Sequence, residues 1–137
     1  MATLFNFEVH TPYRPFYSGK VEAITLTLID GEIGVYANHS PFTAPAVTCI
    51  LRIKDAQGWR PAFITDGILE VKDRKTVLIV DTAEWPEEID YDRALAAQEQ
   101  AKEALGTGML KFEIDNAMAK LRRADYRLKV WDLRGKI

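Results

Sequence analysis

The stretch Asp81-Thr-Ala-Glu-Trp-Pro-Glu-Glu-Ile-Asp-Tyr-Asp-Arg-Ala94 separates two halves of the chain that differ in sequence pattern. Before it, apolar residues alternate with polar ones, and Gly or Asp-Gly turns interrupt them every few residues. After it, the residues are mainly Ala, Gln, Glu, Lys and Leu. Pro86 prevents a strand from running through, and Asp90 is well placed to cap a first helix. The stretch therefore predicts a boundary between a β domain, residues 1–85, and a helical region, residues 86–137.

The first half predicts an all-β domain of about ten strands. Alternating apolar runs recur near residues 4–11, 21–28, 33–36, 47–53, 59–64, 68–71 and 76–80. Residues 13–19 are expected to form a loop, and Pro45 is expected to keep its neighbours irregular. Because no helical periodicity occurs before residue 90, helical crossovers are absent and the strands are expected to be antiparallel. The pattern predicts an antiparallel sandwich or barrel.

Two helical patterns follow the boundary, joined by a short connection at Gly106-Thr-Gly108. The first pattern has a narrow face of small residues at Ala94, Ala97, Ala101 and Ala104. The second has one apolar stripe formed by Ile114, Ala117, Met118, Leu121, Ala124, Leu128 and Trp131. The short connection predicts an antiparallel helical hairpin. The tail that begins at Trp131 has no pattern that we can interpret.

Composition excludes several classes of function. The net charge of -2 over 137 residues gives no basic face for nucleic acid. Cys49 is the only cysteine, so neither an internal disulfide nor a thiolate metal cluster is expected. No apolar run is long enough for a membrane span, and the first residues do not resemble a secretory signal. We expect a cytoplasmic protein without a metal site.

The hairpin is predicted to bring charged residues together near its base. Antiparallel pairing about a turn near Met109 places Asp90 and Arg93 opposite the segment 123–129. Arg123 and Arg127 then converge with Arg93, and Asp90 is the one acid directed among them. Arginine is the side chain best suited to phosphate, so a polyphosphate is the expected ligand. In the alternative interpretation, which spacing leaves open, these arginines form a solvated face partly neutralised by Asp92, Glu99 and Asp125.

No pattern predicts a catalytic site. His39 and Ser40 lie in a polar turn, but no nucleophile is flanked by a base and an oxyanion-forming glycine motif. A histidine in such a turn is usually structural or interfacial. We expect a protein that is not an enzyme.

Nearly the whole chain resembles the epsilon subunit of F-type ATP synthase. The resemblance rests on the order and spacing of Thr11-Pro-Tyr-Arg14, Tyr17-Ser-Gly19, Gly31-Glu-Ile-Gly-Val35, Asn38-His-Ser-Pro41, Leu51-Arg-Ile53, Asp66-Gly-Ile-Leu-Glu-Val71, Asp81-Thr-Ala-Glu84 and Ile89-Asp-Tyr-Asp-Arg-Ala94. It implies a rotor subunit whose β-sandwich binds the gamma subunit and the membrane c-ring. It also implies a hairpin that either folds against the sandwich or extends into the alpha/beta head, where it restrains ATP hydrolysis.

The resemblance also implies a regulatory ATP site. Some bacterial members bind ATP through an Ile/Leu-Asp-x-x-Arg-Ala motif together with arginines of the second helix. The residues that match are Ile89, Asp90, Arg93, Ala94, Arg123 and Arg127. Asn116 departs from the family, because relatives often have a basic residue there. ATP is thus expected as a regulatory ligand, and no obligatory cofactor is expected.

The resemblance further places Glu32, His39 and Ser40 in loops that contact gamma or the c-ring, at the cytoplasmic face of a bacterial membrane. The alternative function is a free-standing β-sandwich binding module whose hairpin docks on another partner. Trp85 and Trp131 are both expected to pack where the hairpin meets the sandwich.

Overall fold

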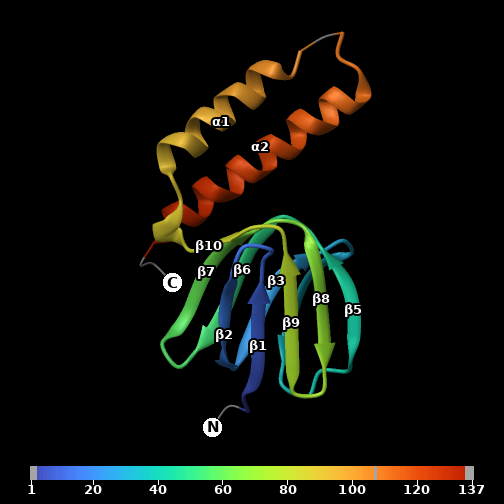
Figure 1. Cartoon of the computed structure of the whole chain (residues 1–137), viewed down its shortest axis with the longest axis vertical. Helices are drawn as coiled ribbons and strands as arrows, with labels where there is room; N and C mark the ends of the chain where they lie inside the picture. Colours follow the sequence, from blue (N-terminus) through green and yellow to red (C-terminus); the bar gives the residue numbers. More distant parts are fainter. Residues whose placement is uncertain (1–2, 107, 135–137) are drawn as a thin grey trace.

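A computed structural model of the chain describes residues 3–106 and 108–134, so the middle residue of the predicted turn and the end of the tail lie outside the described part. A β domain forms one half and a helical hairpin rises from one end of it (Figure 1). The elements, in chain order, are β1 (Phe5–His10), β2 (Pro15–Val21), β3 (Ala23–Leu28), β4 (Gly31–Tyr36), β5 (Phe42–Ala46), β6 (Cys49–Asp55), β7 (Gly58–Ile64), β8 (Gly67–Lys72), β9 (Lys75–Val80), β10 (Ala83–Glu84), the 3-10 helix η1 (Pro86–Glu88), α1 (Tyr91–Ala104) and α2 (Lys111–Asp132).

The ten strands form two layers that share one hydrogen-bonded edge. One layer contains β10, β7, β6, β3 and β4, and the other contains β5, β8, β9, β1 and β2. The layers are joined where β3 meets β5 through the single residue pair Leu28 and Ala46. The predicted all-β sandwich of about ten strands, followed by a helical hairpin, is therefore confirmed.

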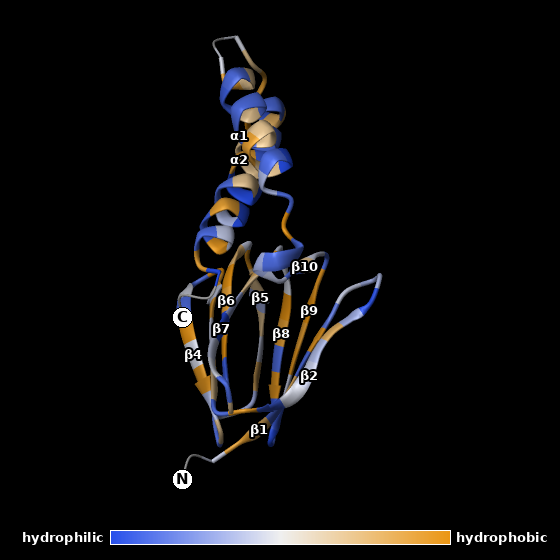
Figure 2. Ribbon diagram, turned by 90° about the vertical axis from the view of Figure 1, so that its left-hand side faces the viewer, coloured by the Kyte–Doolittle hydropathy of each residue, from blue (hydrophilic) through white to orange (hydrophobic). Residues whose placement is uncertain are grey.

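The core lies between the two layers. Inward-facing residues such as Phe7, Leu51 and Leu78 are fully buried, and Ile24 and Leu26 of β3 point into the core as their alternation predicts. Figure 2 shows hydrophobic segments concentrated in the strands and hydrophilic ones along much of the helices. Burial of this apolar surface, at about 25 cal/mol per Å², is the main source of stability for the β domain.

Two local expectations were wrong. Residues 13–19 do not form a loop throughout, because β2 begins at Pro15 and pairs with β1. The expectation for the residues after Pro45 was wrong at Ala46, since Pro45 and Ala46 lie within β5, with Pro45 opposite Ile68 of β8, whereas Val47 and Thr48 belong to no strand. β5 is paired along its length only with β8 and meets β3 at one residue pair. The missing N–H of Pro45 therefore does not interrupt a continuous series of hydrogen bonds on the other side of the strand.

The expectation of a purely antiparallel sheet was also wrong at one place. β1 pairs with β9 in parallel, from Asn6 opposite Lys75 to His10 opposite Ile79. Parallel neighbours need a long connection, usually a helix. Here seven strands intervene between β1 and β9, so the rest of the sandwich makes the connection.

The hairpin begins as the sequence predicts. The Asp90 carboxylate accepts a hydrogen bond from the backbone N–H of Arg93 at 3.1 Å, which confirms Asp90 as the N-cap of α1. The apolar stripe of α2 is only partly covered, because Ala117 and Ala124 are buried while Ile114 and Met118 are 39% and 42% exposed. A two-helix hairpin has only one partner helix, which is too narrow to cover the whole stripe.

Gly67 offers a test of the β-domain packing. A Cβ built at Gly67 would overlap the carbonyl oxygen of Ile79 on β9, whereas one at Gly106 would meet nothing within 4 Å. We expect Gly67→Ala to lower the free energy of unfolding by about 2 kcal/mol or more, because a backbone atom cannot move aside cheaply. Gly106→Ala should change it by less than about 0.5 kcal/mol. Urea unfolding of both variants checks this, and equal stabilities would contradict the described packing.

Candidate functional site

A groove of about 780 Å³ runs along the hairpin to the end of the β domain. Its size falls within the roughly 300–1,000 Å³ range of small-molecule sites. Most of its wall comes from the two helices, and its base comes from the segment that leads into α1. The residues that line it are Glu84, Glu88, Asp90, Arg93, Ala94, Ala97, Gln100, Ala101, Ala104, Met109, Phe112, Glu113, Asn116, Ala117, Lys120, Arg123, Ala124 and Arg127.

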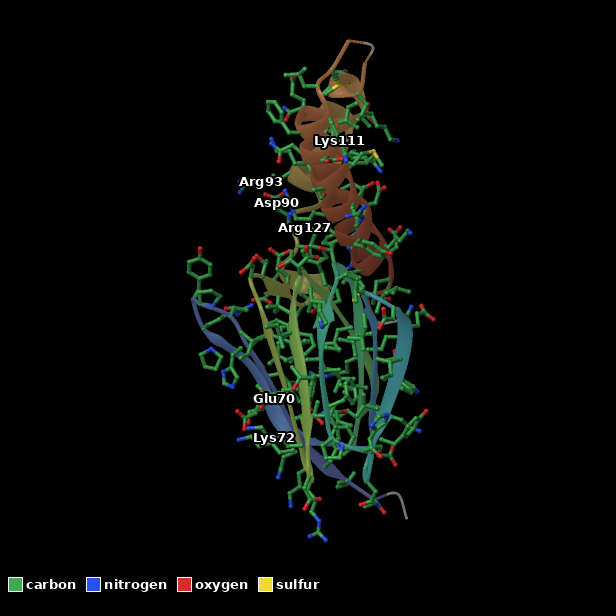
Figure 3. The ribbon with its side chains drawn as sticks, turned by 90° about the vertical axis from the view of Figure 1, so that its right-hand side faces the viewer. Glu70, Lys72, Asp90, Arg93, Lys111 and Arg127 are labelled. Carbon is green, nitrogen blue, oxygen red and sulfur yellow. The ribbon has the colours of Figure 1, made fainter. Side chains whose placement is uncertain are left out.

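The groove collects most of the residues that the sequence singled out. Asp90, Arg93 and Arg127 are grouped toward the base of the hairpin (Figure 3). Ala94 and Arg123, two more of the six residues predicted from the sequence, also line the groove. Ile89 does not line the groove.

Ile89 instead packs beneath the groove. Its side chain is 4% exposed and forms a small core with Phe63 of β7 and Val130 of α2, both fully buried. Partly buried Tyr126 and Trp131 pack against this core. The position of Ile89 thus joins the β domain, the start of α1 and the end of α2.

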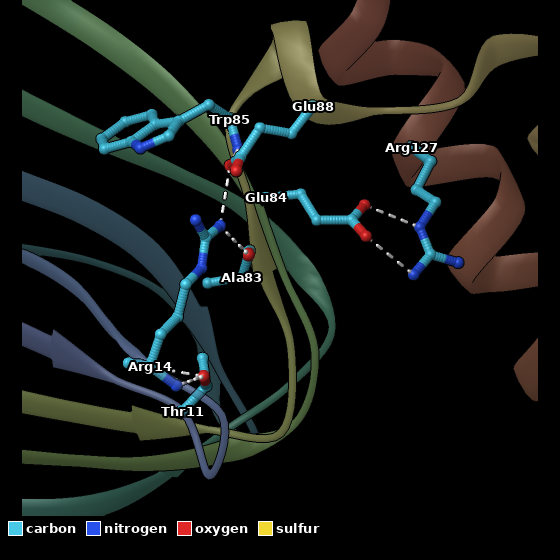
Figure 4. Close-up of polar contacts among 7 residues, drawn as sticks. All are labelled: Thr11, Arg14, Ala83, Glu84, Trp85, Glu88 and Arg127. Atoms are coloured by element: carbon cyan, nitrogen blue, oxygen red, sulfur yellow. Dashed lines mark hydrogen bonds and ion pairs between the residues drawn. The ribbon is translucent and has the colours of Figure 1, made fainter.

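Arg127 is held by an acid that the spacing argument overlooked. Its Nε and Nη2 donate to the two carboxylate oxygens of Glu84 at 2.9 and 3.4 Å (Figure 4). Its guanidinium also lies 4.7 Å from the centre of the Phe63 ring. The expectation that Asp90 is the one acid among the arginines was wrong, because β10 brings Glu84 directly to α2.

A second acid, Glu88, is held from outside the groove. Nη2 of Arg14 donates to Glu88 Oε1 at 2.8 Å, and the Trp85 N–H donates to the same oxygen at 2.9 Å. The hydrogen bond from Arg14 lowers the pKa of Glu88 and, reciprocally, the bond to Glu88 raises the pKa of Arg14. Glu88 is therefore an ionised carboxylate at the rim of the groove, and its negative charge is balanced by Arg14.

Formal charges in the groove balance, but their partners differ. Glu84, Glu88, Asp90 and Glu113 carry four negative charges, and Arg93, Lys120, Arg123 and Arg127 carry four positive ones. Among the described residues, no ion pair within 4.0 Å involves Arg93, Lys120 or Arg123. These three cations are available to an anion, whereas Glu84 and Glu88 already form ion pairs with Arg127 and Arg14.

In the alternative interpretation the arginines form a solvated face that nearby acids partly neutralise. Arg93 is exposed, as that interpretation requires, but the neutralising ion pairs are not among the contacts of the described residues. Asp125 accepts a hydrogen bond from the Gln98 amide at 2.7 Å. Within the described part of the chain, Asp92 and Glu99 make no ion pair with either arginine. Arg123 instead also lines a smaller cavity of about 240 Å³ that contains Asp66 and Asp81 of the β domain.

The two tryptophans differ from each other. Trp131 packs at the hairpin base and lies 5.5 Å from the Tyr91 ring, as expected. The expectation for Trp85 was wrong, because its ring stacks on Phe16 of β2 with centroids 4.4 Å apart. Trp85 therefore belongs to the β domain, on which its aromatic and cationic neighbours are all located.

The predicted interface residues do not form one patch. Glu32 lies at the start of β4, and His39 and Ser40 follow its end, where His39 Nδ1 is 2.8 Å from the Ser40 carbonyl oxygen. β4 runs away from the hairpin (Figure 2). With about 3.3 Å per residue, the first and last residues of this six-residue strand are roughly 17 Å apart.

Neither described helix has the combination of length and apolar character that a membrane crossing requires. Among residues 3–106 and 108–134, no group of three or more His, Cys, Asp or Glu side chains is placed to hold a metal ion.

Sequence reasoning did not identify Glu84 and Glu88 as groove residues. The only feature of the sequence that could have indicated them is that they flank Pro86 and lie a few residues before Asp90. Pairing of β10 with β7 then decides which side of the segment faces Arg127. That pairing is a long-range property of the sandwich.

Two family profiles cover the chain almost end to end. Residues 4–86 match the family described as ATP synthase, Delta/Epsilon chain, beta-sandwich domain. Residues 87–132 match ATP synthase, Delta/Epsilon chain, long alpha-helix domain.

Individual relatives agree with the profiles. The ATP synthase epsilon chain of Caldicellulosiruptor saccharolyticus is 46% identical over 126 residues, 92% of each chain. That of Caldanaerobacter subterraneus subsp. tengcongensis is 45% identical over 131 residues, 95% of each chain. A chain of the Euglena gracilis mitochondrial ATP synthase has the same fold, with a TM-score of 0.72 at 20% identity over 94% of this chain and 78% of that one. The chain described above therefore belongs to the epsilon chains of the ATP synthase delta/epsilon family.

Proposed function

We propose that this protein is a rotor subunit that joins gamma to the c-ring, at the cytoplasmic face of a bacterial membrane. The epsilon chain of ATP synthase is a non-catalytic subunit, which agrees with the absence of a catalytic motif in the sequence. Chains of similar fold occur in the central stalk and c-ring assembly of Tetrahymena thermophila, with a TM-score of 0.62 at 14% identity over 95% of this chain and 98% of that one. The β domain supplies a rigid body for such a role.

The proposed contacts of the β domain lie at both ends of β4. Glu32 is near the hairpin end, and His39 and Ser40 are near the opposite end. Glu32 is roughly 13 Å along the strand from Tyr36, whose carbonyl accepts a hydrogen bond from the His39 N–H, so we assign the two ends to two contacts, with gamma and the c-ring as the partners.

The second part of the proposal is that the groove binds ATP and that ATP regulates the hairpin. The observation that carries it is a set of three cations along one groove, Arg93 on α1 and Lys120 and Arg123 on α2, that form no ion pair with any residue of the described ranges. Phosphate oxygens between Arg93 and Arg123 would connect the two helices through charge-assisted hydrogen bonds. Asp90 and the backbone near Ile89 would contact the adenosine end or position the arginines.

ATP would then act as a ligand of one conformation. The groove exists only while the hairpin is folded and its base contacts the β domain, so ATP stabilises this form at the expense of an extended form that reaches the alpha/beta head. A ligand that binds one state alone stabilises it by about 2.7 kcal/mol at a concentration of 100 times its Kd. Such a shift is large enough to convert a nearly balanced equilibrium into a strongly one-sided one.

Isothermal titration calorimetry with ATP tests the regulatory part. We expect the wild-type protein to bind, and Arg123→Ala to weaken binding by about tenfold or more because charge-assisted hydrogen bonds are lost. Arg122→Ala is the matched control, since Arg122 neighbours Arg123 on α2, is exposed and does not line the groove. Absence of heat at millimolar ATP, or an equal loss in both variants, would remove ATP sensing from the proposal.

Binding to gamma tests the rotor part separately. Co-expression with gamma should yield a stable complex on size-exclusion chromatography. Arg123→Ala should leave the complex intact, because Arg123 lies on α2 and the proposed contacts are on the β domain. The alternative, a free-standing binding module, predicts that the chain elutes alone. Elution without gamma would contradict the rotor assignment whatever the calorimetry shows.

A further inference from the structure

The segment Trp85–Glu88 is attached to the β domain through Trp85 and Arg14, although η1 also packs against α2. The Trp85 ring stacks on Phe16 at 4.4 Å with an interplanar angle of 25°, and it meets the Tyr17 ring edge-on at 6.2 Å. The Arg60 guanidinium lies 4.4 Å from the same ring. All three partners belong to β2 or β7, so the contacts of this indole do not depend on where the helices lie.

Arg14 fastens the far end of this segment. Its Nη2 donates both to Glu88 Oε1 at 2.8 Å and to the Ala83 carbonyl oxygen at 3.3 Å, so one guanidinium spans β10 and η1 (Figure 4). The Thr11 hydroxyl accepts from the Arg14 N–H at 3.1 Å, which holds the turn from which Arg14 projects. An exposed ion pair alone contributes little, but here it acts together with the stacking of partly buried Trp85 on buried Phe16.

The hairpin has a separate set of attachments. These are the ion pair between Arg127 and Glu84 and the apolar contact of Val130 with Phe63 and Ile89. Between the two sets, Ile89 and Asp90 have extended backbone, with φ and ψ of -78° and 128° and of -81° and 98°. They are the only residues between η1 and α1 and belong to neither helix.

We propose that Trp85–Glu88 is a fixed part of the β domain, and that the hairpin pivots at Ile89–Asp90 when it leaves the docked position. Arg14 determines where the pivot lies, because it holds Glu88 and Ala83 on the β domain. The inference rests on the hairpin movement in the proposed function and specifies how that movement is constrained. If the pivot lay before Trp85, extended Trp85 and the three residues of η1 would move with the arm and lengthen its reach by roughly 9 Å.

The experiment uses two tryptophans as separate reporters in the full chain. Trp59→Phe with Trp131→Phe leaves only Trp85, and Trp59→Phe with Trp85→Phe leaves only Trp131. Arg127→Ala with Val130→Ser then removes the ion pair and the buried valine contact of α2 and changes no residue of the β domain. Acrylamide quenching of Trp131 should rise by about twofold, as expected for local opening, while that of Trp85 stays unchanged. A parallel rise at Trp85 would show that the segment leaves with the hairpin and would overturn the proposal.

A second arm tests Arg14 with the hairpin in place. Arg14→Ala should raise the quenching of Trp85 by about twofold and leave Trp131 unchanged, because only the clamp on the segment is lost. Arg14→Lys should restore most of the protection, since an ammonium group can still pair with Glu88. Lys20→Ala, at an exposed position on the same strand pair, is the control and should have no effect. Unchanged Trp85 quenching in Arg14→Ala would overturn the role of Arg14.

Neither arm uses nucleotide. The pivot is therefore tested even if calorimetry finds no ATP binding, and a failed pivot test leaves the ATP site untouched.

Discussion

The position of the hairpin depends on one contact patch at its base, where Arg127 pairs with Glu84 and lies over the Phe63 ring. α2 has 22 residues and α1 has 14, so the eight extra residues carry the end of α2 about 12 Å beyond α1 and onto the β domain. The tip carries Leu110 and Phe112, which are 60% and 67% exposed. A long arm held at one end can be released by disturbing few contacts, which suits a switch better than a rigid strut.

The same ion pair also sets the charge that the groove offers to a ligand. Glu84 holds the hairpin down and at the same time occupies Arg127, leaving Arg93, Lys120 and Arg123 to meet an anion first. Both members of the pair are partly exposed, with 30% and 26% of their side-chain surfaces accessible, so the pair is neither fully screened nor deeply desolvated. Phosphate that recruited Arg127 would have to replace Glu84, and such competition would limit affinity. The proposed ATP site would therefore be suited to sensing rather than to tight retention.

Local sequence rules were sufficient for the features that short-range chemistry decides. The cap at Asp90, the two helices and the convergence of Arg93 with Arg123 follow from capping preference and helical periodicity. Local sequence rules could not identify β2, because that edge strand buries mainly Phe16 and Val21 and shows no apolar alternation. They also missed the strand around Pro45, where proline is tolerated because β5 is paired on one side over most of its length.

The partners of Arg127 and Trp85 lay outside the reach of such rules for a different reason. Glu84 reaches Arg127, 43 residues away, only because β10 pairs with β7 beneath α2. Trp85 turns toward Phe16 for the same reason, since the strand pairing fixes which face of the segment is inward. Sandwich topology, rather than helix pattern, thus decides where the hairpin is anchored and where it is free.

A double-mutant cycle on Glu84 and Arg127 tests this account most directly. Glu84→Gln and Arg127→Met remove the charges while the methionine keeps its contact with Phe63, and unfolding in urea gives the free energy of each single and double variant. We predict a coupling energy of about 1–3 kcal/mol, as expected for a charge-assisted, partly buried pair. A coupling energy within about 0.3 kcal/mol of zero would show that the two sites act independently. That result would contradict the claim that this ion pair holds the hairpin on the β domain.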